Sequence, residues 1–172
     1  MRLLFYKDKF PYLLGGTNAH PAEDALDKDS LTFYCRDGDA IVGTCRITPQ
    51  IANQWEISPC MPTQVSLPTE ADTVQLNRVY VLQTHSHICV HEFMFYHFAE
   101  LLLRYTTFRR YFATCNAALV RLYKRIGARL AYPEAFCLNS RGSHNYYLVA
   151  GTILAFREAV ERRYHIQSKP IL

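Results

Sequence analysis

The chain has 172 residues, of which 49% are hydrophobic and 20% are charged. A chain of this length suits one domain with its own core, and this composition excludes an intrinsically disordered protein. The formal net charge of +4 is too small to indicate nucleic-acid binding by itself, so we expect no nucleic-acid partner.

Membrane insertion and a zinc-binding framework are also disfavoured. The most apolar segment, Ile88–Leu103, carries two histidines and two glutamates, which argues against a membrane span. The first ten residues have charges inside their apolar run and do not resemble a signal peptide. The six cysteines are spread along the chain with no Cys-x-x-Cys pair, which favours free buried thiols over a zinc site. We therefore expect a cytoplasmic protein without a membrane span.

Turn and alternation signals predict a β-hairpin in the first half of the chain. Leu31–Arg36 and Ala40–Thr48 are predicted strands, and the Asp-Gly-Asp sequence between them favours a tight turn. Leu3–Tyr6 is a weaker strand candidate. Pro49–Asp72 contains four prolines and is long for a plain connection, which predicts either a functional lid or short helices.

The second half of the chain alternates strands with helices. Predicted strands cover Val74–Leu82, Tyr111–Thr114 and Asn145–Ala150, and predicted helices cover His87–Arg104, Asn116–Ile126 and Ile153–Tyr164. Apolar residues at helical spacing support the first helix, and an asparagine cap and a terminal glycine bound the second. This order predicts an α/β (α+β) domain in which helices cover both faces of a central mixed sheet.

The segment Cys115–Ala128 (CNAALVRLYKRIGA) carries the sharpest motif. Its Asn116, Tyr123 and Gly127 resemble a signature of the GCN5-related N-acyltransferases. The resemblance implies a GNAT-like, mostly antiparallel sheet with splayed central strands. It also implies that Tyr123 is the general acid that protonates a leaving thiolate. The alternative is a tyrosine that only packs on the sheet.

A second, longer resemblance covers about residues 23–150. Two aspartates three apart precede the hairpin, a Gly-x-x-Arg lies on the next strand, and an arginine lies three residues after position 75 on the central strand: Asp24, Asp27, Gly43, Arg46, Gln75 and Arg78. In order and spacing these residues resemble the acyl-homoserine-lactone (autoinducer) synthases and the long-chain N-acyl amino acid synthases. The resemblance implies that residues 1–172 are a single N-acyltransferase domain.

The donor implied by this resemblance is an acyl-phosphopantetheine, carried by acyl carrier protein or by CoA, with no permanently bound cofactor. No glycine-rich phosphate loop follows the predicted central strand, which suits a carrier protein with its single phosphate. Candidate donor-binding residues lie at the strand–helix junction and in the second helix: Leu82, His85, His87, Asn116, Arg121 and Lys124. The cationic run Arg104–Arg129 would suit docking of an acidic carrier protein, although such runs are more often solvated surface charges.

Acyl transfer to an amine requires a polarised thioester carbonyl and a group that takes the proton of the amine. The resemblance places backbone donors for the carbonyl near Tyr80 and Val81. Gln75 stands where the autoinducer synthases have a glutamate, and an amide cannot accept a proton at neutral pH. The base therefore stays open between a water relay and several side chains: Glu23, Asp24, Asp27, His85 and His87.

Arginines on neighbouring strands of a sheet are costly unless they meet anions. Arg46 and Arg78 could bind the carboxylate of an amino-acid acceptor beside Asp24 and Asp27, or they could form a purely structural network with these aspartates. S-adenosylmethionine is possible as the acceptor. An amino acid or another simple amine is preferred, because the aromatic helices that lactone synthases use for S-adenosylmethionine are not evident before Asp24.

Trp55, Phe95 and Phe98 are candidates to line an acyl-chain pocket, and ordinary core packing is the alternative for each of them. His85, His87 and His91 form a His-x-His-x-x-x-His pattern that metal sites also use. The resembling families need no metal, so we expect none and interpret these histidines as a polar helix start.

These features predict an N-acyltransferase that moves an acyl chain from acyl carrier protein or acyl-CoA to the amine of a small acceptor. The product would be an N-acyl amino acid or a signalling lipid. Two alternatives stay open: an acetyl-CoA-dependent acetyltransferase, and a non-catalytic domain of the same fold that binds a carrier protein or a lipid. The amide at Gln75 is the feature that keeps the non-catalytic alternative open.

Overall fold

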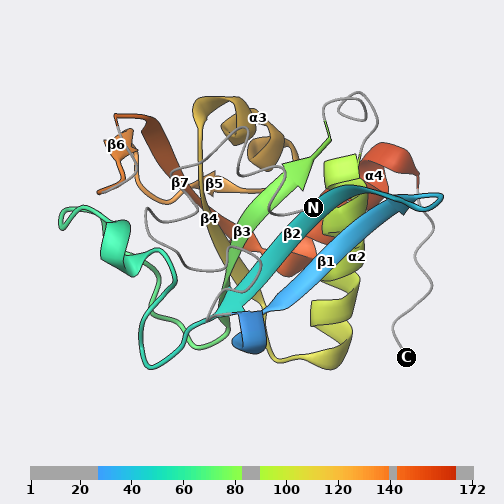
Figure 1. The fold of residues 1–172 in the computed structure, drawn as a ribbon, viewed down its shortest axis with the longest axis horizontal. Coiled ribbons are helices and arrows are strands. Elements are labelled where there is room, and N and C mark those ends of the chain that lie inside the picture. Colours follow the sequence, from blue (N-terminus) through green and yellow to red (C-terminus); the bar gives the residue numbers. More distant parts are fainter. Residues whose placement is uncertain (1–26, 83–89, 140–142, 166–172) are drawn as a thin grey trace.

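The computed structural model of the chain describes residues 27–82, 90–139 and 143–165 (Figure 1). The elements in chain order are η2 (Asp27–Asp29), β1 (Leu31–Asp37), β2 (Ala40–Pro49), η3 (Ser58–Cys60), β3 (Thr73–Val81), α2 (Val90–Tyr105), β4 (Arg110–Cys115), α3 (Ala117–Arg125), β5 (Arg129–Leu130), β6 (Phe136–Cys137), β7 (Asn145–Thr152) and α4 (Ile153–Tyr164). The predicted order of hairpin, long loop and alternating strands and helices is confirmed. The short strands β5 and β6 are not predicted from the sequence, and the strand candidate Leu3–Tyr6 lies outside the described residues.

The strands form one seven-stranded sheet with the order β1-β2-β3-β4-β7-β5, and β6 also pairs with β7. Only β3 and β4 pair in parallel, and every other described pair is antiparallel. A parallel neighbour requires a crossover, and α2 provides it between β3 and β4. The expected mixed, mostly antiparallel sheet is therefore confirmed.

The two parallel strands stay together over a short distance only. Thr73–Gln75 of β3 pair with Arg110–Phe112 of β4, and the described register ends there. β3 nevertheless runs on to Val81 and β4 to Cys115. The strands diverge beyond that point, as Figure 1 shows. The expected splay of the central strands is thus present, and we call the stretch in which β3 and β4 no longer pair the slot.

Local sequence explains where the helices begin and end. The buried stripe of α2 is the predicted one, because Phe95, Phe98, Ala99 and Leu102 are all fully buried. The side chain of Asn116 caps α3 by accepting the N–H of Leu119 at 3.1 Å. No described helix is long and apolar enough to span a membrane.

The end of α3 requires a glycine. Gly127 follows the helix with a φ of +88°, and a Cβ there would lie 3.3 Å from the carbonyl oxygen of Ala155. The positive φ and the close approach of α4 each favour glycine at this position, where the sequence predicts that the helix ends.

The two faces of the sheet are covered differently. Side chains of α2, α3 and α4 share one core with residues of β2, β3 and β4. On the opposite face, residues of the loop between β2 and β3 form a second core with Phe112 and Leu148: Trp55, Ile57, Met61 and Val65. The helices that we expected on both faces therefore share one face in the described residues, because the proline-containing loop buries enough apolar surface to cover the other.

A buried carboxylate joins the three helices. Glu92, in the first turn of α2, is 3% exposed. The hydroxyl of Tyr164 on α4 donates to its Oε2 at 2.5 Å, and guanidinium nitrogens of Arg125 and Arg163 lie 3.6 and 3.7 Å from its Oε1. Because a buried charge is costly without partners, these contacts hold α3 and α4 against the start of α2.

We expect Tyr164→Phe to lower the free energy of unfolding by about 2 kcal/mol, since it removes a hydrogen bond to a buried carboxylate. Urea unfolding followed by circular dichroism measures the change. Tyr105→Phe is the matched control, because that side chain lies at the end of α2 and is 71% exposed. Equal unfolding midpoints for the two variants would contradict this account of Glu92.

Candidate active site

The backbone of β3 is distorted where it borders the slot. Across the β2–β3 ladder Thr44 faces Tyr80 and Arg46 faces Asn77, so one more residue lies on β3 than on β2 between these pairs. The extra residue produces a β-bulge, and Arg78 within it has a φ of +50°. A left-handed conformation costs a non-glycine residue about 1 kcal/mol or more, so the surroundings of Arg78 must hold it there.

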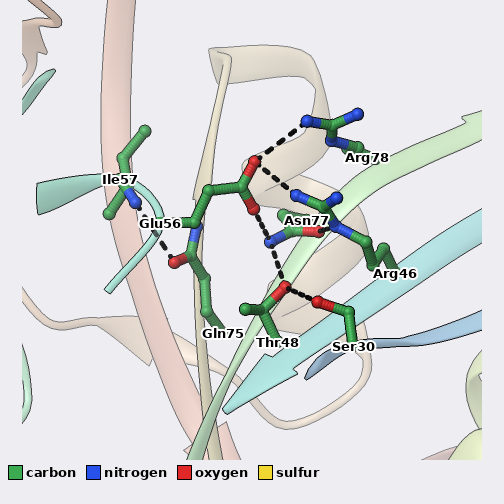
Figure 2. A network of polar contacts seen from close by, with 8 residues as sticks. All are labelled: Ser30, Arg46, Thr48, Glu56, Ile57, Gln75, Asn77 and Arg78. Carbon is green, nitrogen blue, oxygen red and sulfur yellow. Dashed lines mark hydrogen bonds and ion pairs between the residues drawn. The ribbon is translucent and has the colours of Figure 1, made fainter. Parts of the chain in front are cut away.

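The residue that holds Arg78 comes from the loop. The Oε1 of Glu56 lies 3.2 Å from Nη2 of Arg78 and 2.5 Å from Nη2 of the fully buried Arg46. Its Oε2 accepts a short hydrogen bond from Nδ2 of Asn77. Figure 2 shows the carboxylate at the centre of this network, between the loop and the two strands. A buried guanidinium thus meets a carboxylate, as its desolvation cost requires.

Neutral side chains extend the network along β2. The Nε of Arg46 donates to Oδ1 of Asn77 at 3.2 Å, and Nδ2 of Asn77 also donates to Oγ1 of Thr48 at 3.1 Å. The hydroxyls of Thr48 and Ser30 lie 3.0 Å apart, which connects the network to the start of β1 (Figure 2). The polar groups fix one another, so the network is a rigid feature of the loop-covered face.

The structure brings Arg46 and Arg78 together, as the strand pairing predicts. In the described residues both arginines pair with Glu56, which the sequence did not single out. Asp24 lies outside the described residues. Asp27 begins η2, and its side chain lies outside them too.

Gln75, which we expected among the catalytic residues, uses its side chain to hold the loop between β2 and β3. Its side chain is buried, and Oε1 accepts the backbone N–H of Ile57 at 3.3 Å (Figure 2). Gln75 therefore fastens the loop next to Glu56. Because an amide has no titratable proton acceptor, this contact gives position 75 a supporting role.

Tyr123 lies beneath the splayed strands. It is 2% exposed and stacks on Phe95 with ring centroids 5.8 Å apart. Burial raises the pKa of its hydroxyl well above the usual value of 10, and the nearby Cys115, Tyr111 and Cys45 raise it further. These neighbours belong to β4 and β2, so they surround the hydroxyl from both sides of β3. Tyr123 therefore keeps its proton throughout the physiological range and can only donate it.

The remaining candidates at the end of β3 are Tyr80, Val81 and Leu82, and the question for each is whether its backbone N–H is available to an acyl donor. Tyr80 and Val81 lie beyond the bulge, on the part of β3 that has left β4. Burial raises the pKa of the Tyr80 hydroxyl. The N–H of Leu82 donates to the carbonyl of Val42 at 2.8 Å, so this amide is already used by β2 and is not free to bind a donor.

Only some of the predicted donor-binding residues belong to the part of the chain that the structure describes. His85 and His87 lie outside the described residues. Asn116 has its side chain engaged as the α3 cap, whereas Arg121 and Lys124 are exposed on α3. His91 is half-buried, and burial lowers its pKa although Glu92 opposes this. No group of three potential metal ligands occurs among residues 27–82, 90–139 and 143–165.

The structure does not bring the three acyl-pocket candidates together. Trp55 packs edge-on against Phe112, 4.8 Å away, on the loop-covered face. Phe95 and Phe98 are fully buried in the core under the helices, on the other face. Since successive residues of a strand point to opposite faces, Phe112 and its neighbour Tyr111 belong to different cores.

Glu56 is the charged residue of this network that the sequence did not predict. A usable signal exists, because Glu56 is the only charged residue from Gln50 to Thr69. Its neighbours Trp55 and Ile57 are both buried, so the segment is anchored on each side of the carboxylate. A single acid inside an otherwise uncharged, partly apolar loop is a reason to look for a buried cation nearby.

Comparison with known proteins identifies the fold. No protein-family model matches the chain, and no curated protein matches its sequence. The structure is similar to the CoA-dependent acyl-homoserine lactone synthase MesI, with a TM-score of 0.65 and 16% identity over 96% of this chain and 92% of that one. The synthase BjaI, solved with SAM and isopentyl-CoA, gives a TM-score of 0.70 and 13% identity over 96% and 78%.

An IAA acetyltransferase from Bacillus cereus is also similar, with a TM-score of 0.53 and 13% identity over 85% of this chain and 94% of that one. Sequence identities this low show the fold alone. The chain therefore has the GNAT-like fold that lactone synthases and acetyltransferases share, as the sequence motifs predict.

The thiols near Tyr123 give a test of how tightly the core closes around it. Burial raises the pKa of both Cys45 and Cys115 to about 12, so at pH 8 only about one in 10⁴ of either thiol is ionised. We expect iodoacetamide at pH 8 to alkylate the exposed Cys137 and to spare these two in the native protein. Peptide mass spectrometry measures the rates. Labelling of Cys45 or Cys115 as fast as Cys137 would contradict the described core.

Proposed function

We propose that the protein is an N-acyltransferase that moves an acyl group from a thioester donor to the amine of a small acceptor. The observation that carries the proposal is the slot between β3 and β4, with the protonated hydroxyl of Tyr123 beneath it. A gap in a sheet leaves backbone groups of β3 without a strand partner on that side. Fixed N–H groups of this kind can stabilise the oxyanion that forms when an amine attacks a thioester.

The chemistry asks two things of this chain: a polarised thioester carbonyl and a proton for the leaving thiolate. Backbone N–H groups near Tyr80 and Val81 would polarise the thioester carbonyl. As the amine nitrogen bonds to the carbonyl carbon, the carbon–sulfur bond breaks and the thiolate takes a proton from Tyr123. The tyrosine is restored by a proton that the amine has lost, so the net products are an amide and a thiol. The raised pKa keeps Tyr123 protonated between turnovers, so its hydroxyl carries a proton when the donor binds.

The two faces of the sheet suit two different substrates. Tyr123 and the helices lie on one face, and a donor arm would enter the slot beside them. The network of Glu56, Arg46 and Arg78 lies on the loop-covered face. Arg78 keeps 23% of its side chain exposed, so it can still contact an acceptor that carries a carboxylate. We therefore place the acceptor on the loop-covered face, as an amino acid or a molecule similar to S-adenosylmethionine.

The donor is either acyl-CoA or an acyl carrier protein. The similarity to MesI and BjaI, which are described as CoA-dependent, supports acyl-CoA. Exposed cations on α3 and just after it support an acidic carrier protein, because opposite charges accelerate encounter: Arg121, Lys124, Arg125 and Arg129. Both donors present the same phosphopantetheine arm to the slot.

The test of the proposal is a panel of donors and acceptors. Acetyl-, octanoyl- and decanoyl-CoA and the matching acyl carrier proteins are combined with the L-amino acids and with S-adenosylmethionine, and free thiol is followed with a chromogenic disulfide. We expect acceptor-dependent thiol release with medium-chain or long-chain donors. Release with acetyl-CoA alone would favour the acetyltransferase alternative. Absence of acceptor-dependent release from every pair would contradict the proposal.

Tyr123→Phe should lower kcat by roughly 10²- to 10³-fold, since it removes the proton donor to the thiolate. The unfolding midpoint should change little, because the ring that stacks on Phe95 is retained. Tyr105→Phe, on the exposed end of α2, is the control and should keep full activity. A Tyr123→Phe enzyme as fast as this control would remove Tyr123 from the mechanism.

A further inference from the structure

The residues before and after Glu56 in the sequence are both anchored to the core. On one side, the indole N–H of Trp55 donates to the carbonyl of Pro68 at 2.8 Å, and its ring packs on Phe112. On the other side, the N–H of Ile57 donates to the side chain of Gln75. The two residues that flank Glu56 are therefore fixed to the core, which aims the carboxylate at β2 and β3.

The carboxylate has capacity for one more contact. Two carboxylate oxygens offer about four lone-pair positions, and three donors reach them here: Arg46, Arg78 and Asn77. The side chain of Glu56 is 11% exposed, so part of it faces solvent. Asn77 is the one described donor to Oε2, so an N–H donor that reached this oxygen would bind the carboxylate without displacing a protein group.

The neighbourhood of this open position selects one class of donor. Glu56 Oε1 lies 3.2 Å from a guanidinium nitrogen of Arg78, which is itself partly exposed. Partly exposed groups of opposite charge thus stand side by side. An α-amino acid carries an ammonium and a carboxylate separated by a single carbon, so it can pair with both at once. A simple amine would bind only Glu56 and would also face repulsion from the two arginines.

We propose that Glu56 is the acceptor-site carboxylate, that it binds the ammonium of an amino-acid acceptor beside Arg78, and that Gln75 positions it by holding Ile57. This inference rests on the proposed function and adds a residue from the loop to the acceptor site. It makes the loop between β2 and β3 part of the site.

The chain provides an internal reporter for this test. Trp55 is the only tryptophan and directly precedes Glu56, so its fluorescence reports the state of the loop and the binding of small molecules there. Each of the L-amino acids except tryptophan, whose own emission overlaps that of Trp55, is titrated against the wild type, Glu56→Gln, Glu56→Asp and Glu70→Gln, with Trp55 emission as the signal. Glu70→Gln is the matched control, because Glu70 lies on the same loop and pairs with an exposed arginine, Arg110, at 2.9 Å.

Kinetics supply the second readout, with decanoyl-CoA as donor and the amino acid that gives the fastest thiol release. We expect Glu56→Gln to raise the KM for the amino acid by roughly 30- to 100-fold and to leave the KM for decanoyl-CoA within twofold. Gln75→Leu should raise the amino-acid KM as well, with a shifted Trp55 emission, because the loop loses an anchor. The decarboxylated amine of the same acceptor should bind weakly to every variant.

Glu56→Gln leaves the buried Arg46 beside a neutral partner, so that variant could be too unstable to assay. Glu56→Asp keeps the charge and only shortens the side chain, and we expect about a tenfold rise in the amino-acid KM with wild-type Trp55 emission. An amino-acid KM for Glu56→Asp within twofold of that for Glu70→Gln would overturn the inference. Parallel rises in the KM values of both substrates would overturn it too.

Failure of this inference is distinguishable from failure of the proposed function. Amino-acid binding that depends on Glu56 without any thiol release would uphold the acceptor site and contradict the transferase. Thiol release that is indifferent to Glu56 would uphold the transferase and contradict the acceptor site. The fluorescence titration and the kinetic assay therefore decide the two questions separately.

Discussion

The early separation of β3 from β4 is the constraint on which the rest of the structure depends. The two strands pair over three residues, and beyond these residues their backbones no longer pair with each other. Unpaired backbone groups are costly unless something else satisfies them, so a gap of this kind needs support. The support comes from the outer neighbours. β2 pairs with β3 as far as Val81, and β7 pairs with β4 as far as Cys115, so each strand is held along its length from one side while the other side opens.

The opened sheet also explains why the two faces differ. On the helix-covered face, aromatic packing closes the core around Tyr123 and leaves its hydroxyl protonated among buried thiols. On the loop-covered face, the left-handed Arg78 and the buried Arg46 require a carboxylate, and the loop delivers one with Glu56. The same residues that stabilise the distorted strand thus form the polar surface that an acceptor would meet. Stability and proposed function depend on one network.

The sequence predicted the fold well because its signals are local. Asn116 and Gly127 bound a helix by capping alone, and the fully buried stripe of α2 follows from spacing. The proximity of Arg46 and Arg78 follows from two strands predicted as neighbours. Glu56 could not be found this way, since its contacts with Asn77 and Arg78 span 21 and 22 residues and all of its contacts depend on how an irregular loop folds back. For the same reason Trp55 was grouped with aromatic residues that lie on the other face of the sheet.

The most direct measurement is a crystal structure of the protein with a 2-oxoalkyl-CoA thioether, in which a methylene group between the sulfur and the carbonyl makes the donor analogue non-hydrolysable. The account predicts that the pantetheine arm lies between β3 and β4, with its sulfur within hydrogen-bonding distance of the Tyr123 hydroxyl, at most about 4 Å. The carbonyl mimic should face the backbone beyond the Arg78 bulge. A donor bound outside the slot, or strands that pair along their whole length in the complex, would contradict the central claim.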